Sequence, residues 1–226
     1  MQTENDPVFI IRLPSTNIEN SVNYFKSQGF KVIEAEEVIN TVWIQKNNFT
    51  FSVCECAAEH PMLVMYWEKP DQFLMKLEEL SVICNFAVDH QGNHFEALFT
   101  DPAGLTIITA DKNDLPEKCR SADYSDLYEF SLPSVPSFSD SINFWNQLGF
   151  NPVPDKPRPH SWSRMKMDSF TIGIHQSPDW QRPGLVFEGS SPFNNEIEIY
   201  LDLKNCGTAK VSETCDHTLL YQIISD

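Results

Sequence analysis

Trp43, Trp162, Glu129 and His175 combine a chemically useful side chain with a repeated position in the sequence. A flat indole such as that of Trp43 or Trp162 can stack on a planar or cationic ligand. Carboxylate oxygens and imidazole nitrogens are ligand types that Mn, Fe, Ni and Zn accept. The sequence therefore offers candidates for an aromatic binding pocket and for a divalent metal centre.

These residues belong to a pattern that the chain repeats. The stretch NYFKSQGF (23–30) returns as NFWNQLGF (143–150), and VFIIRLPS (8–15) returns as LYEFSLPS (127–134). In each copy a strand that breaks at proline precedes a helix that Gly29 or its counterpart ends, and three short strands follow. The predicted order of one unit is βαβββ.

Four such units are predicted. The second has strands at 62–67, 84–88, 94–100 and 105–110, a helix at 70–80 and an Asp-Pro-Ala-Gly turn at 101–104. The fourth begins at 184–189, with a helix expected within 194–207 and a strand at 218–226. We therefore expect a first paired domain over 1–111, a linker over 112–126 and a second paired domain over 127–226 that lacks its last strand. The open edge left there would favour a homodimer.

Composition excludes several classes of function. The formal net charge of −16 repels phosphate backbones and anionic membrane surfaces, so neither nucleic acid nor a membrane is an expected partner. The start MQTENDPVF has no secretory signal, and we expect a cytoplasmic protein. The six cysteines form no CxxC pair, and no Gly-rich phosphate loop follows a strand.

The chain resembles the vicinal oxygen chelate superfamily. The resemblance rests on the four tandem units, the LPS tripeptides at 13–15 and 132–134, the GF helix ends and the turn at 101–104. This superfamily includes glyoxalase I, extradiol dioxygenases and bleomycin resistance proteins, and the likeness is closest to the bleomycin resistance group. The resemblance implies an α+β fold in which tandem βαβββ units pair into curled mixed sheets around cavities, with helices outside.

Alternation along the strands predicts which side chains face those cavities. In FTFSVC the apolar set Phe49, Phe51 and Val53 would face the helix, and in LYEFSL the set Tyr128, Phe130 and Leu132 would do so. The opposite face then holds the expected ligand-binding residues, which are Trp43, Trp162, Arg12, Gln45, Arg164 and Tyr66.

The resemblance also implies where a metal would be held, because metal enzymes of the superfamily place His, Glu or Gln on the first and last strand of each paired unit. In the first half these positions carry Ile10, Cys54 and Ile108, which excludes a metal there. In the second half they carry Glu129 and His175, with Glu188 as a possible third ligand. The fourth position would lie beyond the end of the sequence.

Two hypotheses follow. The first is a metal-free protein of the bleomycin resistance type, without a cofactor, that sequesters an aromatic or cationic small molecule. The alternative is a lyase or dioxygenase of the superfamily that depends on a divalent metal ion held by Glu129 and His175.

Overall fold

The computed structural model describes most of the chain between residues 6 and 224. Backbone and side chains are described for 6–36, 40–87, 96–122, 124, 127–134, 137–154, 160–177, 180 and 182–187. The backbone alone is described for 88, 94–95, 188, 199–203, 207–213 and 219–224. The described helices are too short and too polar for any of them to cross a membrane.

The first half forms one eight-stranded sheet in the order β2-β3-β4-β1-β5-β8-β7-β6. Two βαβββ units meet where β1 and β5 pair antiparallel, and within each unit the first and last strands pair parallel. Its elements are β1 (Val8–Ser15), α1 (Ile18–Ser27), β2 (Lys31–Glu36), β3 (Thr41–Lys46), β4 (Phe49–Glu55), β5 (Met62–Trp67), α2 (Pro70–Glu79), β6 (Asn85–Val88), β7 (His94–Thr100) and β8 (Thr106–Asp111).

The second half repeats this design in the order β10-β11-β12-β9-β13-β16-β15-β14. The pairing of β9 with β13 is again antiparallel, and β9–β12 and β13–β16 are parallel. Its elements are β9 (Leu127–Pro133), α3 (Phe138–Leu148), β10 (Asn151–Val153), β11 (Ser161–Met167), β12 (Phe170–Gln176), β13 (Gly184–Glu188), β14 (Ile199–Leu203), β15 (Gly207–Glu213) and β16 (Leu219–Ile224).

The expectation that the fourth unit lacks its last strand is wrong, because β16 pairs with β13 in the last-strand place. The expected helix over 194–207 is also wrong for 199–203, which form β14. The stretch EIEIYLDL (196–203) alternates apolar and polar or aromatic residues with a period of two, the pattern of a strand. The edge proposed for dimerisation is therefore filled, and a homodimer stays a prediction.

The helix ends follow the sequence signals. The Asn17 side chain accepts a hydrogen bond from the backbone N–H of Asn20 at 2.9 Å and begins α1. After α1 and α3, Gly29 and Gly149 have φ values of +86° and +114°, which glycine adopts without a Cβ penalty. The positive φ predicted after the repeated helices is thus confirmed at both places.

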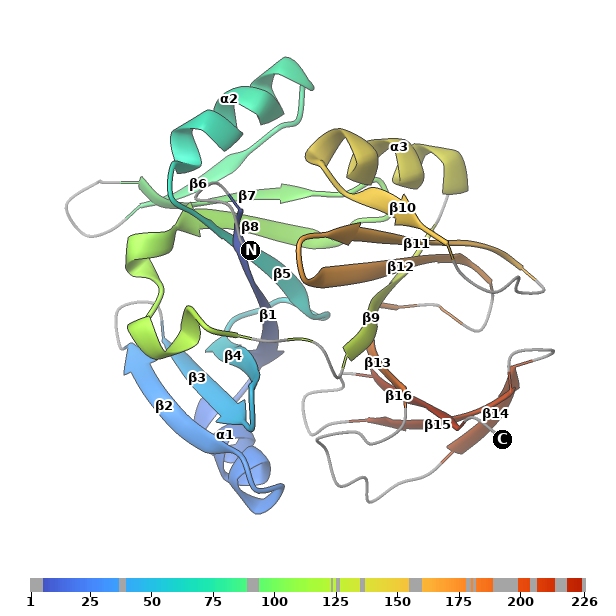
Figure 1. Cartoon of the computed structure of the whole chain (residues 1–226). Coiled ribbons are helices and arrows are strands. Elements are labelled where there is room, and N and C mark those ends of the chain that lie inside the picture. Colours follow the sequence, from blue (N-terminus) through green and yellow to red (C-terminus); the bar gives the residue numbers. More distant parts are fainter. Residues whose placement is uncertain are drawn as a thin grey trace.

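Helix-facing side chains from both halves share one core. Phe9 of β1 stacks on Phe170 of β12 with ring centroids 4.8 Å apart, and both belong to one buried apolar cluster. The Tyr124 hydroxyl, between the halves, donates to the backbone oxygen of Thr50 at 2.7 Å. Because the halves join through the helix-covered sides of their sheets, the concave faces open on different sides of the molecule (Figure 1).

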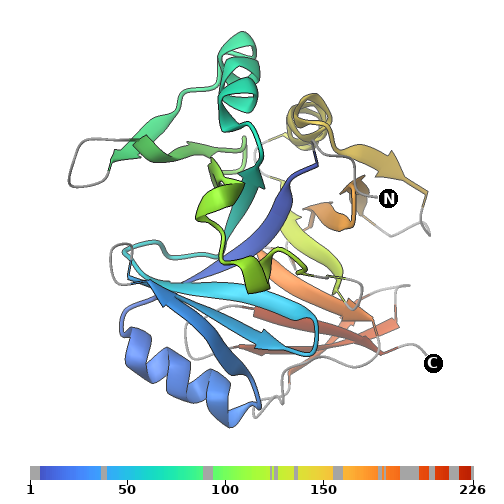
Figure 2. The same ribbon diagram turned by 60° about the vertical axis from the view of Figure 1, so that its left-hand side comes forward.

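The segment expected as a linker packs on the first sheet. Two 3₁₀ turns, Lys112–Asp114 and Glu117–Cys119, follow β8 and lie over the concave face of that sheet (Figure 2). Leu115 and Cys119 are buried there in one cluster with Trp43. The first concave face is therefore filled partly by the chain's own connecting segment.

Candidate functional site

The second sheet brings Glu129 and His175 together on its concave face. In β9, Phe130 and Leu132 are buried in the shared core, so Glu129 must lie on the opposite face. In β12, Ile172 and Ile174 face the core in the same way, which leaves His175 on the concave side. The alternation inferred from the sequence thus gives the faces of Glu129, Phe130, Leu132 and His175 correctly. It is wrong for Tyr128, which is half-buried against Arg164, because the β9–β13 register shifts there and Leu127 takes the core position instead.

Glu129 and His175 form a fully buried hydrogen-bonded pair. His175 Nε2 lies 2.6 Å from Glu129 Oε1, and neither side chain is exposed to solvent. The other ring nitrogen, Nδ1, lies 3.1 Å from Nε2 of His160, and the protonation of the two rings decides which nitrogen donates. The three side chains therefore form a short hydrogen-bonded chain, with the imidazole of His175 in the middle.

Gly173 makes the space that the Glu129 carboxylate occupies. It lies on β12, between Thr171 and His175 on the concave face. A Cβ atom at this position would lie within 2.5 Å of all three atoms of the Glu129 carboxyl group, whereas ordinary contact begins at 3.4 Å. A glycine is therefore required here by close packing, although its φ is not positive.

Two tryptophans flank the His175 ring. Trp180 stacks on it at a centroid distance of 4.2 Å and an interplanar angle of 14°, and Trp162 stacks at 5.7 Å and 19°. Trp180 is buried and Trp162 is half-buried. The indole faces fix the plane of the imidazole.

Arg164 brings a positive charge to the same carboxylate. Its Nε lies 4.0 Å from Glu129 Oε2, and its Nη2 donates to the backbone oxygen of Tyr128 at 3.1 Å. The guanidinium carbon also lies 4.0 Å from the centre of the Tyr128 ring. Arg164 was predicted as a ligand contact, and the structure places it at the Glu129 side of the site.

Two members of this cluster, His160 and Trp180, were not predicted. Both lie just outside strands, His160 before β11 and Trp180 after β12. Strand alternation cannot assign a face to residues outside a strand. The sequence signal for these two residues was their type, an imidazole and an indole close to strands predicted to carry the site. Glu188, the possible third ligand, lies on β13, and its side chain is outside the described part of the chain.

The register of β13 limits the donor set of the second sheet. Val186, which is apolar and buried, is the partner of Glu129 across the β9–β13 pair. Within the described residues no three His, Cys, Asp or Glu side chains are grouped so as to hold a metal ion. Glu129 and His175 therefore provide two donors, and any further ligand would come from water or from undescribed side chains.

The predicted binding residues of the first half are packed against one another. Trp43 is fully buried. Arg12 lies 2.9 Å from Glu96 Oε1, and its Nη2 donates to the Tyr66 hydroxyl at 3.3 Å. Burial raises the pKa of Tyr66 to about 12, so this hydroxyl stays protonated at neutral pH.

Gln45, the remaining first-half residue of the prediction, donates through Nε2 to Thr50 Oγ1 at 3.0 Å. A ligand on this face would have to displace the segment that carries Leu115 and Cys119. Trp43 and Trp162 lie on different sheets, so the structure does not bring them into one site. Ligand contact by the first-half residues stays a prediction.

The chain matches no known family by sequence. No curated protein matches it by sequence either. Its structure does resemble solved proteins. One is the Mn(II)-bound glyoxalase from Novosphingobium aromaticivorans, with a TM-score of 0.60 and 12% identity over 96% of this chain and 82% of that one. Another is the 2,3-dioxygenase LapB from Pseudomonas sp. KL28, with a TM-score of 0.61 and 12% identity over 97% and 92%.

An extradiol ring-cleaving dioxygenase from B. fuscum is similar in the same degree, with a TM-score of 0.61, 12% identity, and coverage of 100% of this chain and 74% of that one. The chain has the vicinal oxygen chelate fold. Structural similarity at identities this low establishes the fold but not the reaction, because one fold can carry many functions. The predicted bleomycin resistance subgroup is not among these similarities and stays a prediction.

Proposed function

We propose that this chain is a divalent-metal-dependent enzyme, a lyase or a dioxygenase, that works from Glu129 and His175 on the concave face of the second sheet. The carboxylate oxygen and the imidazole nitrogen converge to 2.6 Å at the first-strand and last-strand positions of one βαβββ unit. Those are the positions at which the resemblance places metal ligands.

The chemistry of these two side chains suits such an ion. An anionic carboxylate and a neutral imidazole are ligands for Mn, Fe, Ni and Zn alike. The space left by Gly173 accommodates the Glu129 carboxylate, and the stacked Trp180 ring fixes the plane of the His175 imidazole. A bound ion would act as a Lewis acid that holds neighbouring oxygens of a small substrate and stabilises the negative charge that develops there.

The surrounding residues have roles of their own. With Nε2 as the ligand atom, the Nδ1–H of His175 would donate to His160, an outer contact that fixes the ring and raises its basicity. Arg164 places a positive charge beside the site, where it can orient an anionic or oxygen-rich substrate. Trp162, half-buried, offers a flat surface for a planar substrate.

A metal-free binding protein is the second candidate, and the partners of Glu129 favour it. Its carboxylate already faces both the His175 ring and the Arg164 guanidinium, as the hydrogen-bonded wall of a pocket would. In this case the pair would stay buried and hydrogen-bonded, and Trp162 and Arg164 would contact the small molecule directly.

Titration of the chelator-treated protein with Mn(II), followed by thermal unfolding, separates the two candidates. An ion present at 100 times its Kd stabilises the folded state by about 2.7 kcal/mol, or about 5 to 10 °C for a chain of this size. We expect this shift in the wild type and in a His60→Gln control, and its loss in Glu129→Gln and His175→Gln. An equal shift in all four proteins, or in none, would exclude the metal site.

The reaction class needs a second assay. Oxygen uptake with catechol as substrate would support a dioxygenase, and isomerisation of a thiol adduct of a vicinal dicarbonyl would support a lyase. Turnover of neither substrate, together with a metal-independent thermal shift, would favour the binding protein.

A further inference from the structure

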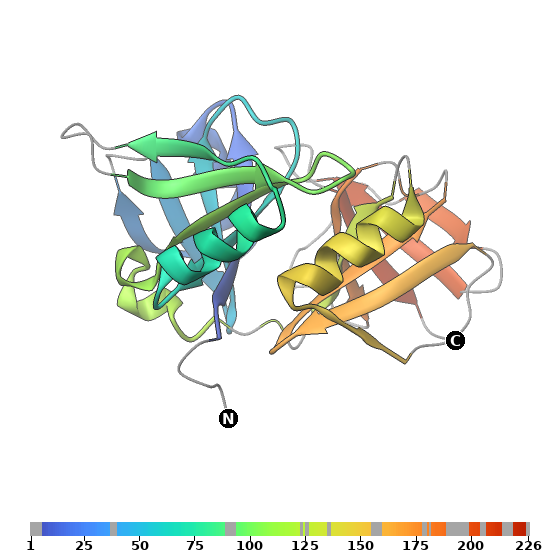
Figure 3. The ribbon, with the colours of Figure 1, turned by 90° about the horizontal axis from the view of Figure 1, so that it is seen from above.

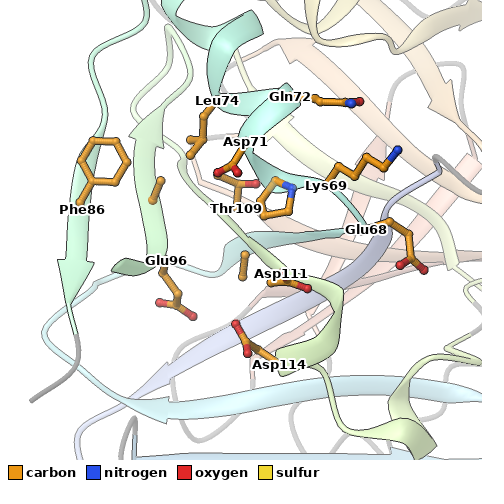
Figure 4. A pocket seen from close by; sticks show the side chains of 13 residues that line it. Glu68, Lys69, Asp71, Gln72, Leu74, Phe86, Glu96, Thr109, Asp111 and Asp114 are labelled. Carbon is orange, nitrogen blue, oxygen red and sulfur yellow. The ribbon is translucent and has the colours of Figure 1, made fainter. Parts of the chain in front are cut away.

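A separate pocket of about 540 Å³ lies in the first half, beside the N-terminal end of α2 (Figure 4). Its walls come from α2, β6, β7, β8 and the 3₁₀ turn after β8. It belongs to the other sheet from Glu129 and His175, and its volume suits a small organic molecule. Five carboxylates line it, those of Glu68, Asp71, Glu96, Asp111 and Asp114.

The negative charge of this pocket is only partly neutralised. Glu68 pairs with Lys112 at 3.0 Å, and Glu96 pairs with Arg12 at 2.9 Å. Within the described chain, Asp71, Asp111 and Asp114 form no ion pair. Burial and the nearby charges of Asp111 and Glu96 raise the pKa of Asp114 above its usual value. The carboxylates thus repel one another, and a bound cation would relieve that repulsion.

A buried hydroxyl in the wall gives an independent indication of a ligand. Thr109 of β8 lines the pocket and is 2% exposed, and its Oγ1 has no hydrogen-bond partner among the described residues. Most buried hydroxyls are paired, because an unpaired one costs free energy on folding. An ammonium group in the pocket would supply the missing donor.

The spacing of the carboxylates and the apolar residues of the lining indicate which kind of cation the pocket would bind. Three carboxylates do not meet closely enough in the described chain to hold a metal ion. Leu74 and Phe86 add apolar surface, and Phe86 is 47% exposed. Figure 4 shows these two side chains on one side of the pocket and Glu68 on the other.

We propose that this pocket binds a primary organic ammonium ion that has an apolar part. The ammonium group hydrogen-bonds to the Thr109 oxygen and to the carboxylates of Asp71, Asp111 or Asp114, and the apolar part lies on Leu74 and Phe86. Lys69, which also lines the pocket, leaves the net charge of the lining negative. The proposal is independent of any metal on the second sheet.

Phenethylamine is a suitable probe, because it joins a primary ammonium to an aromatic ring. Calorimetric titration of the full chain should detect binding, and phenylacetate, which has the ring but the opposite charge, should not bind. Asp114→Asn and Asp71→Asn should each weaken binding by about two- to five-fold, the range for exposed charges screened by salt. Glu19→Gln, which removes an equal charge from α1, should leave the affinity unchanged.

Thr109→Val separates a ligand contact from a purely structural residue. The variant removes an unpaired buried hydroxyl at almost constant volume, so its Tm without ligand should equal or exceed that of the wild type. Its affinity for phenethylamine should nevertheless fall. The proposal is overturned if phenethylamine and phenylacetate bind alike, if Glu19→Gln weakens binding as much as Asp114→Asn, or if no binding occurs at millimolar concentration.

Discussion

Replacement of Gly173 by alanine tests the packing on which the second-sheet site depends. The new Cβ would lie within 2.5 Å of Cδ, Oε1 and Oε2 of Glu129, about 1 Å closer than ordinary contact. Because Glu129 is fully buried, its carboxylate cannot move without leaving the 2.6 Å hydrogen bond to His175. The substitution therefore disturbs the site through the contact between the new Cβ and the Glu129 carboxylate.

The expected cost has two parts. Overpacking of a tight interior costs about 1 to 3 kcal/mol, and loss of a hydrogen bond to a charged group costs about 1.5 to 3 kcal/mol. The parts overlap, because a carboxylate that moves relieves the clash, so we expect a total of about 2 to 4 kcal/mol. For a chain of this length that corresponds to a fall in Tm of about 5 to 12 °C.

Urea unfolding of a double-mutant cycle measures the contact itself. In a Glu129→Ala background the carboxylate is gone, so Gly173→Ala should cost less by about 1.5 kcal/mol or more than in the wild type. In a Glu129→Gln background the shape is kept, so the overpacking part of the cost should remain. Equal costs of Gly173→Ala in the wild-type and Glu129→Ala backgrounds, within about 0.5 kcal/mol, would show that a Cβ at residue 173 does not collide with the Glu129 carboxylate.

Two further predictions concern other parts of the molecule. The Cys54 and Cys56 sulfur atoms lie 3.0 Å apart, and the hydrogen bond from the Cys54 thiol lowers the pKa of Cys56 to about 6. Iodoacetamide should therefore alkylate Cys56 with a midpoint near pH 6 and faster than Cys84, and an equal rate at both would contradict this. Tyr124→Phe removes the hydrogen bond to the Thr50 backbone and should cost about 1 to 3 kcal/mol in urea unfolding, whereas an unchanged stability would show that this bond does not stabilise the packing of the connecting segment on β4.

The sequence predicted the order of strands and helices in the first three βαβββ units, but not in the fourth. The repeat of the Asn23 to Phe30 stretch, the apolar alternation in the strands and the glycine after each repeated helix all depend on short-range physics. Those signals predicted the βαβββ units, the helix-facing set around Phe51 and the concave positions of Glu129 and His175. Figure 3 shows the result, with α2 and α3 side by side over the two halves.

Other features needed the three-dimensional structure. Leu115 and Cys119 cover the concave face of the first sheet from a segment that contains two 3₁₀ turns. Such short turns have no periodic sequence pattern from which this packing could be predicted. The role of Gly173 depends on a contact between β9 and β12, which lie about 40 residues apart in the chain. The repeat predicts a helix within 194–207, whereas the alternation at 199–203 indicates the strand β14 that the structure has.

If Glu129 and His175 hold a divalent ion, freshly purified, untagged protein should contain it. Mass spectrometry should find close to one Mn, Fe, Ni or Zn per chain in the wild type and in His60→Gln, and should find it lost in His175→Gln and Glu129→Gln. A wild-type protein without metal after growth in Mn-, Fe-, Ni- and Zn-supplemented medium would contradict this assignment. Metal that both site variants retain would contradict it equally.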